Sequence, residues 1–266
     1  MSPNGDKAIT VALVNNKGGV GKTTTAVSLS TELARGGRKV LLVDLDGQGS
    51  ASRSLGLDRE DLYPGVAEAM LEGLSVRKAI KPSYIPKLDI LAGSMNLVST
   101  DVFLADVEKR EFVLRKAIEP AVSDYDYIFL DCPTSFGLLT VNALTSADYS
   151  ILPVTPDYLG FEGLVNLMDA VEKTKDGIGE AAELLGILIT MADYRVRVTR
   201  EIGDMIRERF GRMVFNTEIR TNVRLREAPS YGKSIFDYDI RSHGAEAYSR
   251  LAKEVVNRIR QDRLKV

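Results

Sequence analysis

A loop rich in glycine and lysine carries the residues best suited to chemistry in this chain. Residues 15–24 read Asn-Asn-Lys-Gly-Gly-Val-Gly-Lys-Thr-Thr. Glycines let backbone N–H groups turn inward around phosphate oxygens, and the first turn of a following helix adds the positive end of its dipole. Lys22 supplies a full positive charge, and the hydroxyl of Thr23 is placed to ligate Mg²⁺. The loop therefore predicts a site for the phosphates of a nucleotide.

One position of the loop departs from the usual phosphate-loop pattern. That pattern requires glycine at position 16, where this chain has Asn16, and a second lysine, Lys17, follows it. Eight consecutive positions, residues 17–24, fit the variant Lys-Gly-Gly-x-Gly-Lys-Thr-Thr. A glycine turn that merely joins a strand to a helix would not need so many fitting positions, so we favour phosphate binding.

Two aspartates stand at the ends of buried apolar runs. Asp44 ends the run 39–44, and Asp131 ends the run 127–131. Ligands of an open parallel sheet bind beyond the carboxyl ends of its strands, so both side chains should converge on the phosphates. Asp131 is then a candidate for holding Mg²⁺ through water, and Asp44 for positioning the attacking water. Taken singly, either aspartate could equally cap a strand end, and the loop upstream favours the functional interpretation.

The elements that position these residues follow from the hydrophobic pattern. Short apolar runs predict strands at residues 8–14, 39–44, 88–92, 127–131, 149–154, 184–190 and 213–215. Helical spacing predicts helices at residues 24–35, 107–122, 160–175, 199–210 and 244–260. This alternation predicts an α/β fold with a doubly wound, mostly parallel sheet and helices on both faces. We see no linker or repeat, so residues 1–266 are expected to form a single domain, with residues 1–7 as a flexible tail.

Composition excludes several classes of protein. With 44% hydrophobic and 27% charged residues, the chain is neither disordered nor fibrous. No apolar run approaches the roughly 18 residues that a membrane helix needs, and residues 1–7 lack the apolar core of a signal peptide. Cys132 and His243 are the single cysteine and the single histidine, which leaves no internal disulfide and no Cys/His zinc cluster. We therefore expect a cytoplasmic protein.

Several segments resemble the ParA/Soj family of partition ATPases, whose deviant Walker A loop the variant pattern matches. Residues 44–51 are similar to the family's Asp-Leu-Asp-Pro-Gln-Gly-Asn-Ala, and residues 131–135 to its Asp-Cys-Pro-Pro-Ser. Residues 222–232 are similar to its Asn-Val-Arg-Leu-Ser-Glu-Ala-Pro-Ser-x-Gly, and residues 244–255 also fit. The resemblance thus extends from residue 14 to about residue 255.

Three departures from the family pattern concern the site itself. Gly47 and Thr134 each replace a proline, which could loosen both switch segments. Arg220 and Thr221 replace a Pro-Arg pair before Asn222, so the pocket on the adenine side could differ. The loop begins at residue 15, which leaves no room for the helix-turn-helix domain of larger ParA proteins, so operator binding is not expected.

The resemblance implies a homodimer that forms with ATP and Mg²⁺ and hydrolyses ATP weakly until a partner stimulates it. Lys17 of each subunit would reach the phosphates of the other, so the implied catalytic residues are Lys17, Lys22 and Asp44. Thr23 and Asp131 would hold the metal. The implied nucleotide-binding residues are Lys17, Gly18, Gly19, Val20, Gly21, Lys22, Thr23, Thr24, Arg220 and Asn222.

An uneven charge distribution adds a second implied surface. The net charge is −2, yet residues 191–266 carry 17 Lys and Arg against 11 Asp and Glu. By resemblance, Arg195 and Arg224 fall where the family binds double-stranded DNA without sequence preference. The alternative is a solvated surface with local salt bridges. The family further implies a nucleoid-associated protein that moves a chromosome or plasmid partition complex through a ParB-type or other cargo adaptor.

Two rival functions share the same loop. A MinD-like membrane ATPase would need a terminal amphipathic helix, and the last predicted helix has an apolar face at Tyr248, Leu251, Val255 and Ile259. Packing of that face against the sheet explains the spacing equally well, so we expect no stable membrane binding. The other rival is an ATP-locked scaffold with little turnover. One cysteine excludes an iron–sulfur reductase of this loop class.

Overall fold

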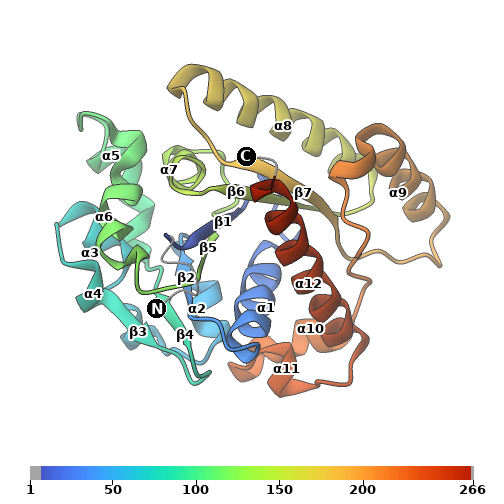
Figure 1. The fold of residues 1–266 in the computed structure, drawn as a ribbon, viewed down its shortest axis with the longest axis horizontal. Coiled ribbons are helices and arrows are strands. Elements are labelled where there is room, and N and C mark those ends of the chain that lie inside the picture. Colours follow the sequence, from blue (N-terminus) through green and yellow to red (C-terminus); the bar gives the residue numbers. More distant parts are fainter. Residues whose placement is uncertain (1–6, 265–266) are drawn as a thin grey trace.

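A computed structural model describes residues 7–264, and its centre is one seven-stranded sheet. The strand order is β3-β4-β2-β5-β1-β6-β7, and every neighbouring pair is parallel except β3 with β4. Figure 1 shows the sheet between its helices. The strands are β1 (Ile9–Leu13), β2 (Val40–Asp44), β3 (Ile80–Pro82), β4 (Leu88–Leu91), β5 (Tyr127–Asp131), β6 (Tyr149–Val154) and β7 (Glu183–Ile189).

Helices cover both faces of the sheet, and each face has its own hydrophobic core. One core packs against the sheet from α1 (Lys22–Arg35), α2 (Ser50–Ser54), α11 (Ile235–Tyr238) and α12 (His243–Arg263). The other core includes α3 (Val66–Leu71), α4 (Val76–Ala79), α6 (Val113–Val122), α7 (Leu138–Ser146), α8 (Tyr158–Ile178) and α9 (Arg197–Phe210). Two short helices, α5 (Thr100–Phe103) and α10 (Val223–Glu227), complete the set.

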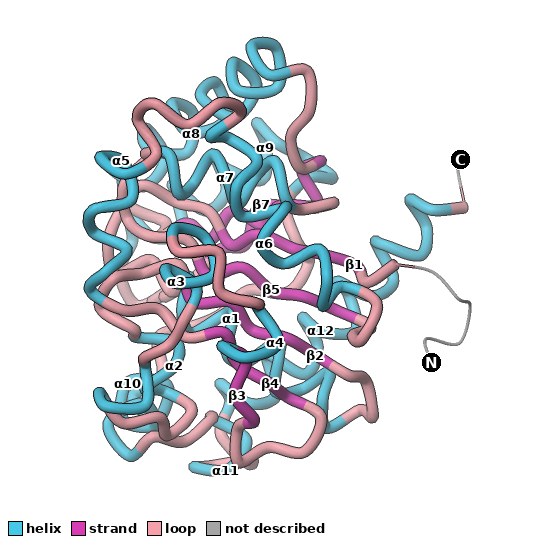
Figure 2. Tube along the Cα trace, turned by 90° about the vertical axis from the view of Figure 1, so that its left-hand side faces the viewer, coloured by secondary structure: helices cyan, strands magenta, loops and turns pink. Residues whose placement is uncertain are grey.

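The central strands are mostly apolar because helices bury them from both sides, and the main exceptions are the aspartates that end β2 and β5. All residues of β2, β5 and β6 are buried. β1 lies between β5 and β6, so the loop that follows β1 has the ends of both neighbours beside it. Figure 2 shows α2, α5 and α10 along one side of the molecule, and α2 follows the carboxyl end of β2. The strand order therefore brings the residues of the predicted site together at the carboxyl ends of the central strands.

The predicted fold class is confirmed, whereas several element boundaries are wrong. Residues 213–215 do not form a strand: a 3₁₀ turn ends at Met213, and Val214 makes only an isolated bridge to Ile187. The helix predicted from residue 107 begins at Val113, after a separate 3₁₀ turn. The short antiparallel edge strand β3 was not predicted, and neither were the helices α2, α3, α4, α5, α7, α10 and α11. The predicted flexible tail falls largely on residues 1–6, which lie outside the described residues.

The last helix has the packing role that the sequence left open. Tyr248, Leu251, Val255 and Ile259 are all buried in the core beside α1, and Figure 1 shows α12 alongside α1. The apolar face of α12 therefore packs against the hydrophobic core of the protein. Between residues 7 and 264, the structure contains no helix with the length and apolar character required to span a bilayer.

Candidate functional site

The glycine-rich loop forms an open cradle between β1 and α1. Gly19 and Gly21 have φ angles of 74° and 87°, in the left-handed region that side chains disfavour. Gly21 precedes the first turn of α1, where helix N–H groups lack partners within the helix. Gly18 and Gly19 are exposed, while Val20 is buried and fixes the middle of the loop. This backbone can surround an anion at the positive end of the α1 dipole.

Two long-range hydrogen bonds hold the cradle in place. The side-chain amide of Asn15 donates to the Pro153 carbonyl at 2.6 Å, and its oxygen accepts from the Lys17 N–H at 2.8 Å. Thr190 directly follows β7, and its hydroxyl donates to the Val20 carbonyl at 2.8 Å. The loop is thereby tied to the ends of β6 and β7.

Lys22 lies at the start of α1 with its amino group directed back over the loop. Its Nζ donates to the Lys17 carbonyl at 3.2 Å, and the residue is only 6% exposed. Burial lowers the pKa of Lys22, and the nearby Asp131 carboxylate partly offsets that effect. A buried ammonium of this kind needs an anionic partner, which nucleotide phosphates would provide.

Asp44 and Asp131 end adjacent strands and are aligned in the register of β2 with β5. Asp44 is fully buried, and it accepts hydrogen bonds from the Ser52 N–H at 2.9 Å and the Ser52 hydroxyl at 2.8 Å. Burial nevertheless raises the pKa of Asp44 to about 6. Through Ser52, Asp44 therefore connects the end of β2 to α2.

Among the residues of the site, Asp131 has the fewest hydrogen bonds to its side chain for its burial. It is fully buried, and within residues 7–264 neither carboxylate oxygen has a hydrogen-bond partner of normal geometry. Burial and the neighbouring Asp44 raise the pKa of Asp131 well above its usual range, although Thr23 and Lys22 act in the opposite direction. A buried carboxylate without partners is costly unless a cation satisfies it.

The polar groups at this point are of the kinds that suit Mg²⁺. Mg²⁺ is usually held by one or two carboxylates together with substrate phosphates and water. Asp131 and the neighbouring hydroxyl of Thr23 form such a partial set. Across the described part of the chain, no group of three or more His, Cys, Asp or Glu side chains is arranged for a metal ion.

Lys17 extends away from Lys22 toward the start of α8. Its Nζ lies 3.0 and 3.1 Å from the two carboxylate oxygens of Asp157 and 3.5 Å from the Thr155 hydroxyl. Asp157 also accepts the Gly160 N–H at 2.8 Å and so caps α8. Burial opposes ionisation of Asp157, but the hydrogen bonds from Thr155 and Lys17 outweigh it and lower the Asp157 pKa. The two loop lysines therefore have different partners.

Arg220 and Asn222, which the family resemblance assigns to the adenine side, lie beside the loop. Both line a small pocket together with Gly21 and Thr24. The Arg220 guanidinium stacks on Tyr194 at 5.2 Å from the ring centre. Asn222 caps α10 by accepting the Arg224 N–H at 2.9 Å. Apolar side chains such as Met191 and Leu225 line the same pocket, so polar and apolar groups both lie next to the loop.

Arg195 and Arg224 are exposed, and both are engaged in local ion pairs. Arg195 contacts Asp193 at 2.6 Å, and Arg224 contacts Glu227 at 2.8 Å. These contacts correspond to the alternative of a solvated surface with local salt bridges. Surface pairs of this kind contribute little free energy and exchange readily with other anions. The contacts of Arg195 and Arg224 with DNA stay a prediction.

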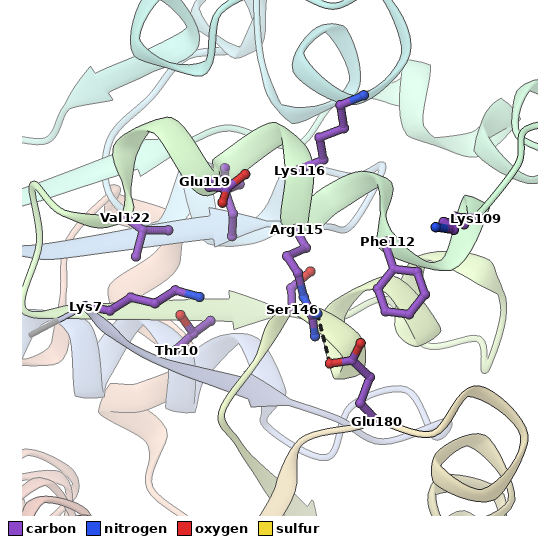
Figure 3. Close-up of a pocket in the computed structure, with 11 residues that line it drawn as sticks. Lys7, Thr10, Lys109, Phe112, Arg115, Lys116, Glu119, Val122, Ser146 and Glu180 are labelled. Atoms are coloured by element: carbon purple, nitrogen blue, oxygen red, sulfur yellow. Dashed lines mark hydrogen bonds and ion pairs between the residues drawn. The ribbon is translucent and has the colours of Figure 1, made fainter.

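A separate cavity lies at the opposite edge of the sheet. Its lining comes from the start of β1 at Thr10, from α6 along most of its length, and from the end of α7 at Ser146. Figure 3 shows Arg115 in this cavity, where it pairs with Glu180 at 2.9 Å. Ligands of doubly wound sheets bind beyond the carboxyl ends of the strands. This cavity is therefore not part of the candidate site.

Sequence analysis did not single out four side chains that support the site. Asn15 and Ser52 lie within segments already singled out, but their roles depend on contacts in the fold. Asp157 follows β6, and Thr190 follows β7. Since the rule on carboxyl ends of strands marked Asp44 and Asp131, the same rule applied to β6 could have found Asp157.

The chain is similar in sequence to known proteins of one family. Residues 8–183 match the family described as AAA domain. The chain is 39% identical over 248 residues to the chromosome partitioning protein ParA of Myxococcus xanthus, covering 93% of this chain and 88% of that protein. It is 41% identical over 245 residues to the sporulation initiation inhibitor protein Soj of Bacillus subtilis, covering 92% and 97%.

A solved structure of a relative agrees with the predicted fold and cofactors. Cobyrinic acid a,c-diamide synthase from Mycobacterium smegmatis, with bound ADP and magnesium, has a TM-score of 0.80 and 30% identity to this chain. The match covers 92% of this chain and 93% of that one. ADP and magnesium in that structure are consistent with the predicted ATP, ADP and Mg²⁺. From the curated relatives and the matched domain, the chain belongs to the ParA/Soj-type family of partition ATPases.

Proposed function

We propose that the protein is an ATP-dependent switch that positions a partition complex on DNA. ATP would close a homodimer, the dimer would bind double-stranded DNA without sequence preference, and a ParB-type or other cargo adaptor would stimulate hydrolysis. Residues 1–266 would act as one domain, in association with the nucleoid. The observation that carries the proposal is the placement of Lys22, Asp44 and Asp131 together at the phosphate cradle of a ParA/Soj family member.

In the proposed mechanism the cradle of residues 17–24 binds the phosphates of ATP. Backbone N–H groups around Gly19 and Gly21 would donate to the phosphate oxygens, and Lys22 would exchange its bond with the Lys17 carbonyl for a phosphate contact. Thr23 and Asp131 would hold Mg²⁺, which neutralises negative charge on the phosphates. The unsatisfied Asp131 carboxylate supports this role because a cation would remove its desolvation cost.

Asp44 is proposed to orient the water that attacks the terminal phosphate. Its carboxylate is held by Ser52 and by the Asp46 N–H at 3.2 Å, so its direction is fixed before ATP arrives. A pKa of about 6 leaves Asp44 mostly ionised at neutral pH yet able to accept a proton. We expect Asp44→Ala to keep the ATP-bound dimer and lose turnover. Normal phosphate release by that variant would exclude Asp44 from the mechanism.

Lys17 is proposed to reach the nucleotide of the partner subunit. Two like-charged lysines approaching across a dimer need the triphosphate between them, so loss of the terminal phosphate would release the dimer. We expect Lys17→Ala to keep nucleotide binding by the monomer and to weaken dimerisation or turnover. Unchanged ATP-dependent dimerisation and hydrolysis would reject this role.

The test of the whole proposal is co-sedimentation with non-specific DNA and, in parallel, with anionic liposomes. Each mixture contains Mg-ATP, Mg-ADP or no nucleotide, at low and high salt. We expect DNA binding with ATP only, and we expect high salt to abolish it because each phosphate contact releases counterions. Arg195→Ala and Arg224→Ala should weaken this binding. Liposome binding without DNA binding would instead favour a MinD-like function.

A further inference from the structure

The ammonium group of Lys17 already has a partner for each of its donors. A lysine ammonium has three N–H donors. Lys17 Nζ lies within hydrogen-bonding distance of three oxygens, two of Asp157 at 3.0 and 3.1 Å and one of Thr155 at 3.5 Å. A phosphate of a partner subunit would therefore have to displace at least one of these bonds.

Asp157 is itself fixed by contacts that do not involve Lys17. One of its oxygens accepts the Gly160 N–H, and the other accepts the Thr155 hydroxyl at 2.5 Å. Gly160 lies so close to Thr155 that a Cβ at this position would stand 2.2 Å from the Thr155 carbonyl. This tight turn holds the Asp157 carboxylate at the start of α8, in place to receive Lys17.

We propose that Asp157 is a positioning residue that holds Lys17 within its own subunit and thereby sets the ATP concentration at which the dimer forms. This inference rests on the proposed role of Lys17 across the dimer. When two subunits meet, both Lys17 side chains must leave Asp157 before they can contact the opposite phosphates. The Lys17–Asp157 pair thus competes with dimerisation in each subunit.

The size of the effect follows from the exposure of the pair. The side chains of Lys17 and Asp157 are 38% and 46% exposed, so water screens their attraction. Exposed ion pairs of this type change an equilibrium by about 1.4- to 5-fold. Because a dimer contains two such pairs, abolishing them should tighten ATP-dependent dimerisation by about 2- to 30-fold.

Asp157→Asn separates the charge from the structural role of this residue. Asparagine caps helices as well as aspartate does, so the bond to the Gly160 N–H and the start of α8 should be preserved. Glu183→Gln is the matched control, since Glu183 pairs with Lys175 on the surface in the same way. The dimerisation constants of the wild type and both variants are measured by analytical ultracentrifugation over a series of ATP concentrations.

A second measurement tests the pair without any dimer. Nucleotide-free protein is treated with a trace of an amine-acylating reagent, and the labelling rates of Lys17 and Lys175 are read by peptide mass spectrometry. In Asp157→Asn, Lys17 should be labelled faster while Lys175 is unchanged. In Glu183→Gln, Lys175 alone should be labelled faster, and dimerisation should match the wild type.

The two measurements together test whether the Lys17–Asp157 pair opposes dimerisation. Faster labelling of Lys17 with tighter ATP-dependent dimerisation of Asp157→Asn supports the proposal. Unchanged labelling, or faster labelling with equal or weaker dimerisation, overturns it. A wild-type protein that stays monomeric with ATP would refute the proposed function instead, and labelling would still determine whether Asp157 holds Lys17.

Discussion

The buried carboxyl group of Asp44 should make the stability of the nucleotide-free protein decrease as pH rises from acid to neutral. The pKa of Asp44 is about 6 in the folded protein, against 3.8 for an ordinary aspartate, because burial disfavours its ionised form. Between these two values the folded protein binds more protons than the unfolded chain. The free energy of unfolding therefore falls as pH rises through this window.

The magnitude follows from the two pKa values. A difference of about two units corresponds to about 3 kcal/mol of stability at full ionisation, at ~1.36 kcal/mol per unit. Of this, about 2 kcal/mol should be lost between about pH 4.5 and about pH 7.5. The Asp44→Asn variant cannot ionise at this position. It also relieves Asp131, whose pKa Asp44 raises, so the variant should depend less on pH by at least this amount.

The assay is urea unfolding of both proteins at several pH values in buffer free of nucleotide and magnesium. The comparison uses the slope against pH, since asparagine cannot accept every hydrogen bond that Asp44 accepts and its absolute stability will differ. Ser54→Ala is a control that leaves the carboxylates intact and should retain the wild-type slope. If Asp44→Asn loses stability with pH as steeply as the wild type, burial of an ionisable Asp44 is not the cause.

Two further predictions concern the supports of the site. Gly160→Ala should destabilise the protein by about 2 kcal/mol or more, because its Cβ would stand 2.2 Å from the Thr155 carbonyl, whereas Gly177→Ala in the same helix has no atom within 4 Å and should stabilise it by about 0.5–1 kcal/mol. Thermal unfolding of the two variants checks this, and equal effects would contradict it. Thr190→Val removes the hydroxyl beside the Val20 carbonyl and should weaken ATP binding by about 2- to 10-fold in a fluorescent-nucleotide titration. Wild-type affinity in that variant would show that the loop does not depend on β7.

Local sequence patterns were sufficient for the framework of the site. Continuous apolar runs identified the buried strands, since strands covered on both faces have no polar side. The glycine-rich loop was recognisable because it follows such a strand, and the aspartates at 44 and 131 because each ends one. The same patterns failed at residues 213–215 and at β3, where a few residues carry little periodic signal and the pairing partner decides the conformation.

The partners of individual side chains were decided by the tertiary structure alone. The sequence placed Lys17 in the loop, but the order β5-β1-β6 brought the end of β6 beside it and gave it Asp157, 140 residues away. Two other contacts of the loop arise in the same manner. Asn15 bonds to Pro153, 138 residues away, and Thr190 bonds to Val20, 170 residues away. No local spacing encodes such contacts, because they depend on which strands become neighbours and in which register. Local sequence patterns thus indicated which side chains are candidates for phosphate chemistry, whereas the packing of the strands set the partner of each side chain, because contacts between distant residues exist only in the folded sheet.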